Sequence, residues 1–320
     1  MRSLFLTILF VLFLSSLLSQ QEGTGNALWE KDLKKANELY LLTEPTTETD
    51  SLALNLFIEV AGKIPQGGIQ DSIAADCFAK AANIHQGYQR FIEASIQYHQ
   101  ALERGAMFAG IRYTSWLNLG SNHYFSFRID SAQLYFEKAS ELADTLKAKG
   151  RTLPELDVLY NSLGAIYFES ANYNQAQNYF EQARQYISKD APEYRDLITG
   201  IENNIANCYM KRHRFDTALF ILRSLAPSPN QQEIIRQNMA HVLFEQGKYD
   251  SALAIYNTLN PLSGFNRIVA LNNIARIFMA RGDWPRAEKV FDSSLSEIRK
   301  EAAGIRNKEE ALAYLYRSRL

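Results

Sequence analysis

Asparagine recurs along this chain at positions that suit hydrogen bonding to another polypeptide. Asparagine or serine stands at intervals of 34 to 44 residues, at Asn118, Ser162, Asn204, Asn238 and Asn273. The preceding position is also asparagine in three of these places, at Asn161, Asn203 and Asn272. An asparagine side chain offers one carbonyl acceptor and two N–H donors, so it can pair with both the N–H and the C=O of an extended peptide. Side chains of this type are therefore suited to pairing with a peptide backbone, whatever the sequence of that peptide.

The remaining polar residues form no catalytic or metal-binding motif. The sequence has no glycine-rich phosphate loop, no G-x-S-x-G nucleophile motif, no C-x-x-C pair and no H-E-x-x-H zinc motif. We therefore expect no catalytic residues, no metal and no cofactor, and we expect the chain not to be an enzyme.

Seven alanines mark the elements that must position the asparagine row. Each is followed after four residues by an aromatic residue or leucine, and after seven by a small or apolar residue, which places all three on one helix face. These anchor alanines are Ala53, Ala94, Ala132, Ala176, Ala218, Ala252 and Ala287. A small residue recurs twelve positions before six of them, at Ala82, Gly120, Gly164, Ala206, Ala240 and Ala275. The pattern predicts repeated pairs of helices that pack closely at small residues.

Two copies of the pattern are nearly complete. The first consists of Trp116, Leu119, Gly120, Ala132, Phe136 and Ala139, and the second of Tyr160, Leu163, Gly164, Tyr167, Tyr173, Ala176, Phe180 and Ala183. These residues resemble the signature of the tetratricopeptide repeat family, and the resemblance covers roughly residues 30–300. It implies an all-α, right-handed α-solenoid of about seven helix-turn-helix repeats.

The spacing of the anchors departs from the family pattern. Successive anchors lie 41, 38, 44, 42, 34 and 35 residues apart, whereas the family period is about 34 residues. We therefore expect longer helices or longer connections in the earlier repeats. Residues 64–70, 105–110, 147–154 and 188–192, which contain glycine or proline, are the predicted connections.

The resemblance also implies that the first helix of each pair lines the concave surface. The asparagine row stands on these helices, fourteen and fifteen residues before the anchors. Tyr124, Phe168 and Phe244 are expected to add apolar contact area beside it, which completes the predicted peptide-binding groove. An alternative stays open, because asparagine at this position can instead bond to the adjacent repeat.

Four residues that could carry chemistry are expected to be structural. Cys77 and Cys208 fall in repeats that do not touch, so a disulfide between them is not expected. His85 and His123 stand nine residues before their anchors. We expect both to pack in the core with a satisfied ring nitrogen.

The two ends of the chain differ from its middle. Residues 1–20 carry Arg2 and then an apolar run from Leu4 to Leu18, which is typical of a signal peptide cleaved near Ser19 or Gln20. A retained N-terminal anchor is the alternative. We expect residues 21–66 to form a degenerate first repeat or N-terminal cap, residues 67–300 the solenoid, and residues 301–320 a C-terminal capping helix.

These features together predict an exported scaffold, periplasmic or extracellular, that binds a protein or an extended peptide. The net charge of −1 argues against a nucleic-acid partner, which needs a basic surface. No integral membrane segment is expected after signal cleavage. An alternative is a regulatory module of a larger system that acts with a separate effector, such as a CHAT-type caspase-like protease or a sensor kinase.

Overall fold

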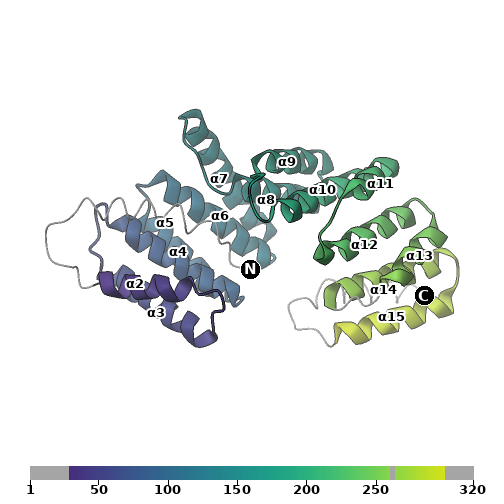
Figure 1. Ribbon diagram of the computed structural model, residues 1–320, viewed down its shortest axis with the longest axis horizontal. Coiled ribbons are helices and arrows are strands. Elements are labelled where there is room, and N and C mark those ends of the chain that lie inside the picture. Colours follow the sequence, from purple (N-terminus) through teal and green to yellow (C-terminus); the bar gives the residue numbers. More distant parts are fainter. Residues whose placement is uncertain (1–28, 260–263, 300–320) are drawn as a thin grey trace. The chain divides into compact units, whose positions relative to one another are not determined.

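The computed structural model describes residues 29–259 and 264–299, and every regular element within these ranges is an α-helix (Figure 1). The first helices are α2 (Glu30–Tyr40), α3 (Thr47–Lys63), α4 (Asp71–Gly87), α5 (Phe91–Arg104), α6 (Ala109–Phe125), α7 (Ile129–Ala148) and α8 (Leu156–Glu169). They are followed by α9 (Tyr173–Tyr186), α10 (Tyr194–Lys211), α11 (Phe215–Ser224), α12 (Pro229–Glu245), α13 (Tyr249–Thr258), α14 (Gly264–Ala280) and α15 (Trp284–Ile298). The predicted signal peptide and C-terminal capping helix lie outside the described residues.

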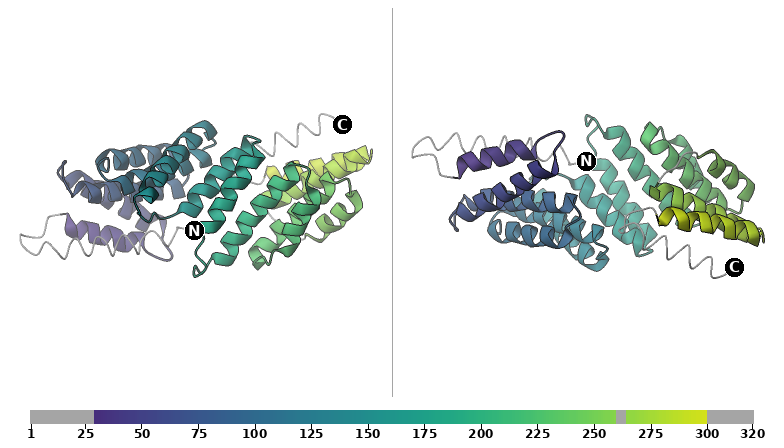
Figure 2. Two further views of the ribbon diagram at one scale, coloured as in Figure 1. Left: turned by 90° about the horizontal axis from the view of Figure 1, so that it is seen from above. Right: turned by 90° about the horizontal axis from the view of Figure 1, so that it is seen from below.

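Consecutive helices pair and stack in the manner of an α-solenoid. The main contacts join helices that are neighbours along the chain, such as α4 with α5 and α6 with α7, or that are two apart, such as α10 with α12. Two further views show the members of a pair running in opposite directions (Figure 2). The prediction of an all-α helical repeat fold is therefore confirmed, while the right-handed superhelix stays a prediction.

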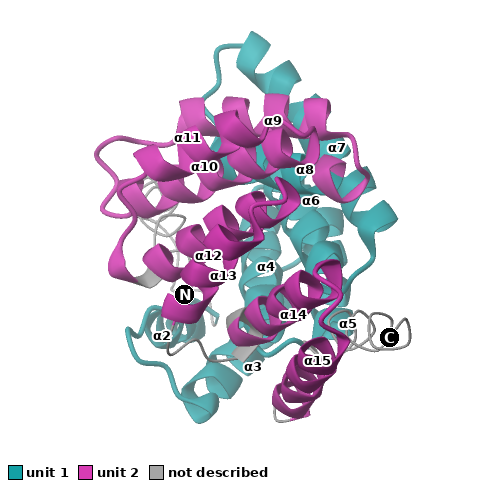
Figure 3. Ribbon diagram, turned by 90° about the vertical axis from the view of Figure 1, so that its right-hand side faces the viewer, with its two compact units in different colours: residues 1–166 teal, residues 167–320 magenta. Residues whose placement is uncertain are grey.

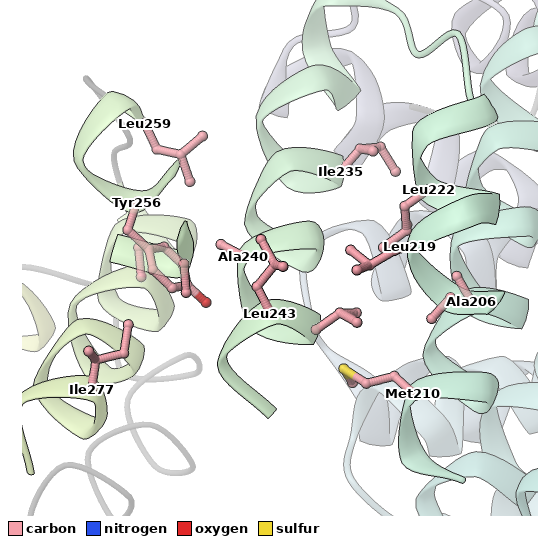
Figure 4. Packing of buried hydrophobic residues seen from close by; sticks show 14 residues of the cluster. Ala206, Met210, Leu219, Leu222, Ile235, Ala240, Leu243, Tyr256, Leu259 and Ile277 are labelled. Atoms are coloured by element: carbon pink, nitrogen blue, oxygen red, sulfur yellow. The ribbon is translucent and has the colours of Figure 1, made fainter. Parts of the chain in front are cut away.

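The chain divides after Ile166, within α8, into two compact units (Figure 3). Unit 1 holds α2 to α7 and most of α8, and unit 2 holds the end of α8 and α9 to α15. Each unit has its own hydrophobic core. In unit 2 one buried cluster runs from α10 to α14 and includes Met210, Leu219, Leu243 and Tyr256 (Figure 4).

The anchor alanines occupy the helix crossings that the sequence predicts. All seven lie on the second helix of a pair and none has any exposed surface. The residue four positions later is also buried in every case, at Phe57, Tyr98, Phe136, Phe180, Leu222, Tyr256 and Phe291. Alanine keeps the two backbones close, and the larger side chain fills the groove beside it.

Glycine replaces alanine at the small-residue position of one crossing in unit 1. Gly120 of α6 faces the ring of Phe136 on α7, and a Cβ added at Gly120 would lie 2.6 Å from two ring carbons. A methyl group therefore does not fit without movement of Phe136, which is itself 1% exposed.

One turn geometry recurs inside the helix pairs. A residue with positive φ follows the first helix, and the next backbone N–H bonds to a carbonyl five residues earlier. The left-handed residue is glycine at Gly247 and Gly282, but Gln89, Phe127, Ala171 and His213 take the same place elsewhere. Each of these four carries a strain of roughly 1–2 kcal/mol relative to glycine.

Longer connections and longer second helices together explain the irregular period. Residues 64–70, 105–108, 149–155 and 187–193 join successive pairs, close to the predicted segments. Helix α7 is also 20 residues long, whereas α11 and α13 have 10 residues each. The shorter second helices occur where the anchor spacing comes closest to the family period.

We predict that Gly120→Ala destabilises the fold. The clash with Phe136 should cost about 1–3 kcal/mol, which exceeds the gain of at most ~1 kcal/mol from the better helix propensity of alanine. Gly200→Ala in α10 is the matched control, because nothing lies within 4 Å of the added methyl group. It should raise the urea midpoint, while Gly120→Ala should lower it. A Gly120→Ala variant as stable as Gly200→Ala would contradict the close crossing.

Candidate functional site

Three first helices of unit 2 carry the densest part of the asparagine row. Helix α10 bears Asn203 and Asn204, α12 bears Asn238, and α14 bears Asn273. The structure places α12 in contact with both α10 and α14. The opposite face of each helix packs on its partner through a fully buried alanine at the small-residue position, Ala206, Ala240 or Ala275. Asn203, Asn204 and Asn238 are half-buried, whereas Asn273 is only 7% exposed and lies inside the packing.

Two of the predicted residues bind each other across neighbouring helices. The Nδ2 of Asn238 donates to the Oδ1 of Asn203 at 2.7 Å, and both side chains are half-buried. The N–H groups of the Asn203 amide and the Oδ1 of Asn238 make no further bond to a described residue. The pair thus presents free donors and a free acceptor side by side.

A polar cluster centred on Arg276, the Arg276 cluster, lies on α12 and α14 of the same unit. Arg276 donates to the Oδ1 of Asn273 at 3.1 Å and to the Oε1 of Glu245 at 3.1 Å. Its guanidinium also lies 4.5 Å above the centroid of the Phe244 ring. Glu245 accepts a second bond from Nε2 of His241 at 3.3 Å. Arg276 thus covers the Phe244 ring, one of the aromatic side chains expected to contribute apolar contact area.

The cluster holds Glu245 as a carboxylate. The hydrogen bond from His241, together with the charges of His241 and Arg276, lowers the pKa of Glu245 to about 2. The negative charge of Glu245 offsets the positive charge of Arg276 at neutral pH. The face therefore carries little net charge beside the amide pair.

The other predicted residues are spread over both units. Asn118 on α6 and Asn161 and Ser162 on α8 belong to unit 1, and all three are half-buried. Tyr124 in the same unit packs edge-on against Phe125. Phe168, which falls in unit 2, packs edge-on against Tyr173. These two aromatic side chains are therefore held by neighbouring rings.

A second polar column lies on the same face, beside the row predicted from the sequence. Asn207, His241 and Arg276 each stand eleven residues before an anchor alanine, on α10, α12 and α14. Counting offsets from the anchors beyond positions fourteen and fifteen would have revealed this second polar column. Its members matter because Arg276 and His241 fix the position of Glu245.

Neither a metal-binding cluster nor a reactive thiol is found in the described part of the chain. It contains no group of three or more His, Cys, Asp or Glu side chains placed to hold a metal ion. Cys77 and Cys208 are buried and unbonded. Burial raises the pKa of Cys208 to about 12, and it raises that of Cys77 as well, so neither thiol ionises near neutral pH. None of the helices resolved between residues 29 and 299 is long and apolar enough to cross a membrane.

Comparison with known families gives matches within the helical region. Two models of the tetratricopeptide repeat match residues 113–145, 158–185 and 270–304. No curated protein matches the chain.

Solved structures match most of the chain in fold. A tetratricopeptide repeat protein from Parabacteroides merdae ATCC 43184 is 16% identical with a TM-score of 0.61, over 89% of this chain and 98% of that one. NprR in complex with its cognate peptide NprX is 15% identical with a TM-score of 0.63, over 91% and 83%. The apo form of this quorum sensor, from B. thuringiensis, is 14% identical with a TM-score of 0.62, over 89% and 79%. At these identities the likeness concerns the fold alone.

We predict that Glu245→Gln reduces the acid sensitivity of the fold. The pKa of Glu245 in the folded chain, about 2, lies below its ordinary value of 4.5, so the carboxylate stabilises the fold above about pH 4.5. This stabilisation is lost as the pH falls towards 2. Urea unfolding across this window should show a smaller loss of stability in Glu245→Gln than in the wild type.

The control for this experiment is Glu233→Gln on the same helix. Glu233 makes no ion pair with a described residue, so this variant should lose stability with acid as the wild type does. Equal acid sensitivity in all three proteins would show that the His241–Glu245–Arg276 cluster does not form in solution.

Proposed function

We propose that this chain, which is a tetratricopeptide repeat protein, binds an extended segment of another protein or peptide along α10, α12 and α14 and catalyses no reaction. The observation that carries the proposal is the Asn203–Asn238 pair, bonded at 2.7 Å across two neighbouring helices.

The pair suits a peptide unit because of the groups that it leaves free. Each peptide unit carries one N–H donor and one C=O acceptor. The Asn203 amide can donate to the C=O, and the Oδ1 of Asn238 can accept from the N–H. Both side chains are already fixed by their mutual bond, so binding orders mainly the ligand. A contact of this kind fits many sequences, which is the property that a scaffold needs.

The charge of the same face limits the choice of partner. Glu245 offsets Arg276, and Arg276 is already bound to Asn273. A strongly acidic peptide therefore finds no free cationic clamp at Arg276. The net charge of −1 likewise gives no basic surface for nucleic acid, so we propose a protein or peptide as the partner.

The comparison with NprR supports a peptide ligand by analogy of fold. NprR holds its cognate peptide NprX on a chain that aligns with 91% of this one. A fold does not fix a function by itself, and the amide pair supplies the argument that is specific to this chain.

The site can be tested by replacing both amides with leucine. Removing both partners of a hydrogen bond leaves no unpaired polar atom, so Asn203→Leu with Asn238→Leu should change the free energy of unfolding by less than ~1 kcal/mol. Peptides selected by the wild-type chain from a displayed random-sequence library should bind the double variant at least about tenfold more weakly, the equivalent of two lost hydrogen bonds.

The matched control is Asn118→Leu, which changes an equivalent row position in unit 1 and should leave the affinity unchanged. Unaltered peptide binding by the double variant would contradict the proposed site. Failure of the wild-type chain to select any peptide would contradict the proposed function.

We also propose that the chain is exported and acts in the periplasm or outside the cell. The support is the sequence of residues 1–20, with its single early arginine and apolar run. Mass spectrometry of the chain recovered from its native envelope fraction should show an N-terminus near Ser19 or Gln20. A mature chain that still begins at Met1 would contradict cleavage.

A further inference from the structure

Helix α5 of unit 1 buries one face and leaves the opposite face uncovered. It packs on α4 and α6 through Ala94 and Tyr98, neither of which has any exposed surface. On the other side, exposed residues recur at intervals of three or four, which aligns them in one stripe along the helix. This stripe consists of Ile92, Ile96, His99 and Glu103. Together with the exposed Arg90 and Glu93 beside it, we call it the α5 face.

The middle of the α5 face is apolar. Ile92 and Ile96 stand one helical turn apart and are 68% and 53% exposed. Isoleucine is among the residues most often buried completely, so two of them on one turn leave apolar area in contact with water. Covering this area with another apolar surface is favourable in proportion to the area removed from water.

Opposite charges stand at the two ends of the α5 face. Arg90 directly precedes α5, and Glu103 lies thirteen residues later, ~20 Å along the helix axis. Arg128, from the turn before α7, lies at the same end as Arg90, because the end of α6 is hydrogen-bonded to the first residue of α5. Glu93 offsets one of the two arginines. One end of the face is therefore positive overall, and the other end is negative.

These charges are not neutralised within the part of the chain that the structure describes. Arg90, Glu93, Glu103 and Arg128 are exposed, and none of them forms an ion pair with another residue of the described ranges. The two ends of the α5 face therefore keep their charges available to a partner.

His99 ties the middle of the face to α7. Its Nδ1 lies 2.7 Å from the carbonyl oxygen of Ser95, and its Nε2 lies 3.0 Å from the hydroxyl of Tyr135. The Tyr135 ring stacks in turn on His123, with 5.3 Å between the ring centroids. His123 is thus packed as expected, although its Nδ1, which was expected to be satisfied, has no partner among the described residues. Because these contacts fix His99 in the free chain, docking on the face would order few side chains.

The α5 face is complementary to a second copy of itself that runs in the opposite direction. The midpoint between Arg90 and Glu103 falls beside Ile96. A two-fold axis through this midpoint, perpendicular to α5, places Ile96 beside its counterpart and Arg90 level with the partner's Glu103. Every contact then occurs twice, as in any two-fold interface. A parallel arrangement would instead set like charges against each other.

We propose that two copies of this chain associate through the α5 face, with their α5 helices antiparallel. The isoleucines of the two copies cover each other at the centre, and the positive end of each face meets the negative end of the other. Positive and negative charges balance over the whole face, so it gives no net attraction to an anionic membrane or a nucleic acid. The interface does not include the amide pair of unit 2, so either proposal can fail without the other.

Sedimentation velocity of the full chain over a range of concentrations tests the interface. The wild type should show a reversible equilibrium between monomer and dimer. Arg90→Glu and Glu103→Arg each bring like charges together at both ends of the interface, so each should raise the dimer dissociation constant at least about tenfold. Both changes suit the dipole of α5, with an acid at its N-terminus and a base at its C-terminus, so neither should destabilise the monomer.

A mixture of these two variants gives the sharpest test of the antiparallel pairing. The Glu103→Arg chain keeps Arg90, and the Arg90→Glu chain keeps Glu103, so a mixed dimer has opposite charges at both ends. An equimolar mixture should therefore dimerise with about the wild-type affinity. The double variant Arg90→Glu with Glu103→Arg should do the same, because its face is again complementary to itself.

Ile96→Ser tests the apolar centre and should raise the dissociation constant at least about fivefold, because the change occurs twice beside the axis. The matched controls lie on α11 of unit 2. Phe220→Ser removes an apolar side chain that is 73% exposed, and Arg223→Glu reverses an exposed charge, and neither should alter the dissociation constant.

Three outcomes would overturn the interface: a wild-type chain that stays monomeric at millimolar concentration, single variants that dimerise as the wild type does, or a mixture that remains monomeric. A monomeric wild type that binds lipid vesicles would assign the α5 face to a membrane surface and would equally overturn the proposal.

Discussion

The fold depends on the close approach of two helices at a residue with little or no side chain. Each anchor alanine is fully buried, and the large residue four positions later is buried beside it. At Gly120 the approach is so close that the Phe136 ring occupies the space of a Cβ. Because one face of each first helix is committed to this packing, its other face is free to carry polar groups. The amide pair and the Arg276 cluster of unit 2 both lie on such faces.

Much of this fold can be predicted from the sequence because close packing restricts residue type. Small residues at the crossings and aromatic residues beside them identified the helix pairs correctly. The turns at Gln89, Phe127, Ala171 and His213 could not be recognised, because the surrounding hydrogen bonds hold a non-glycine residue at positive φ there. The conformational preference of a single residue predicts such a turn poorly, because the packing of two helices fixes the backbone conformation there.

The functional surfaces were less predictable, since they depend on which side chains meet. The sequence indicated that Asn203 and Asn238 stand on neighbouring first helices, but not that one amide donates to the other. Phe244 was expected to offer apolar contact area, but the guanidinium of Arg276 covers its ring.

The pattern of helix contacts also bears on how the chain responds to mechanical force. The main contacts in each unit join helices at most two apart along the chain, and both cysteines are unbonded, so no covalent cross-link ties distant pairs. A pull on the ends of a unit therefore loads one helix pair after another instead of a single central core. We therefore expect each unit to lengthen in steps under load.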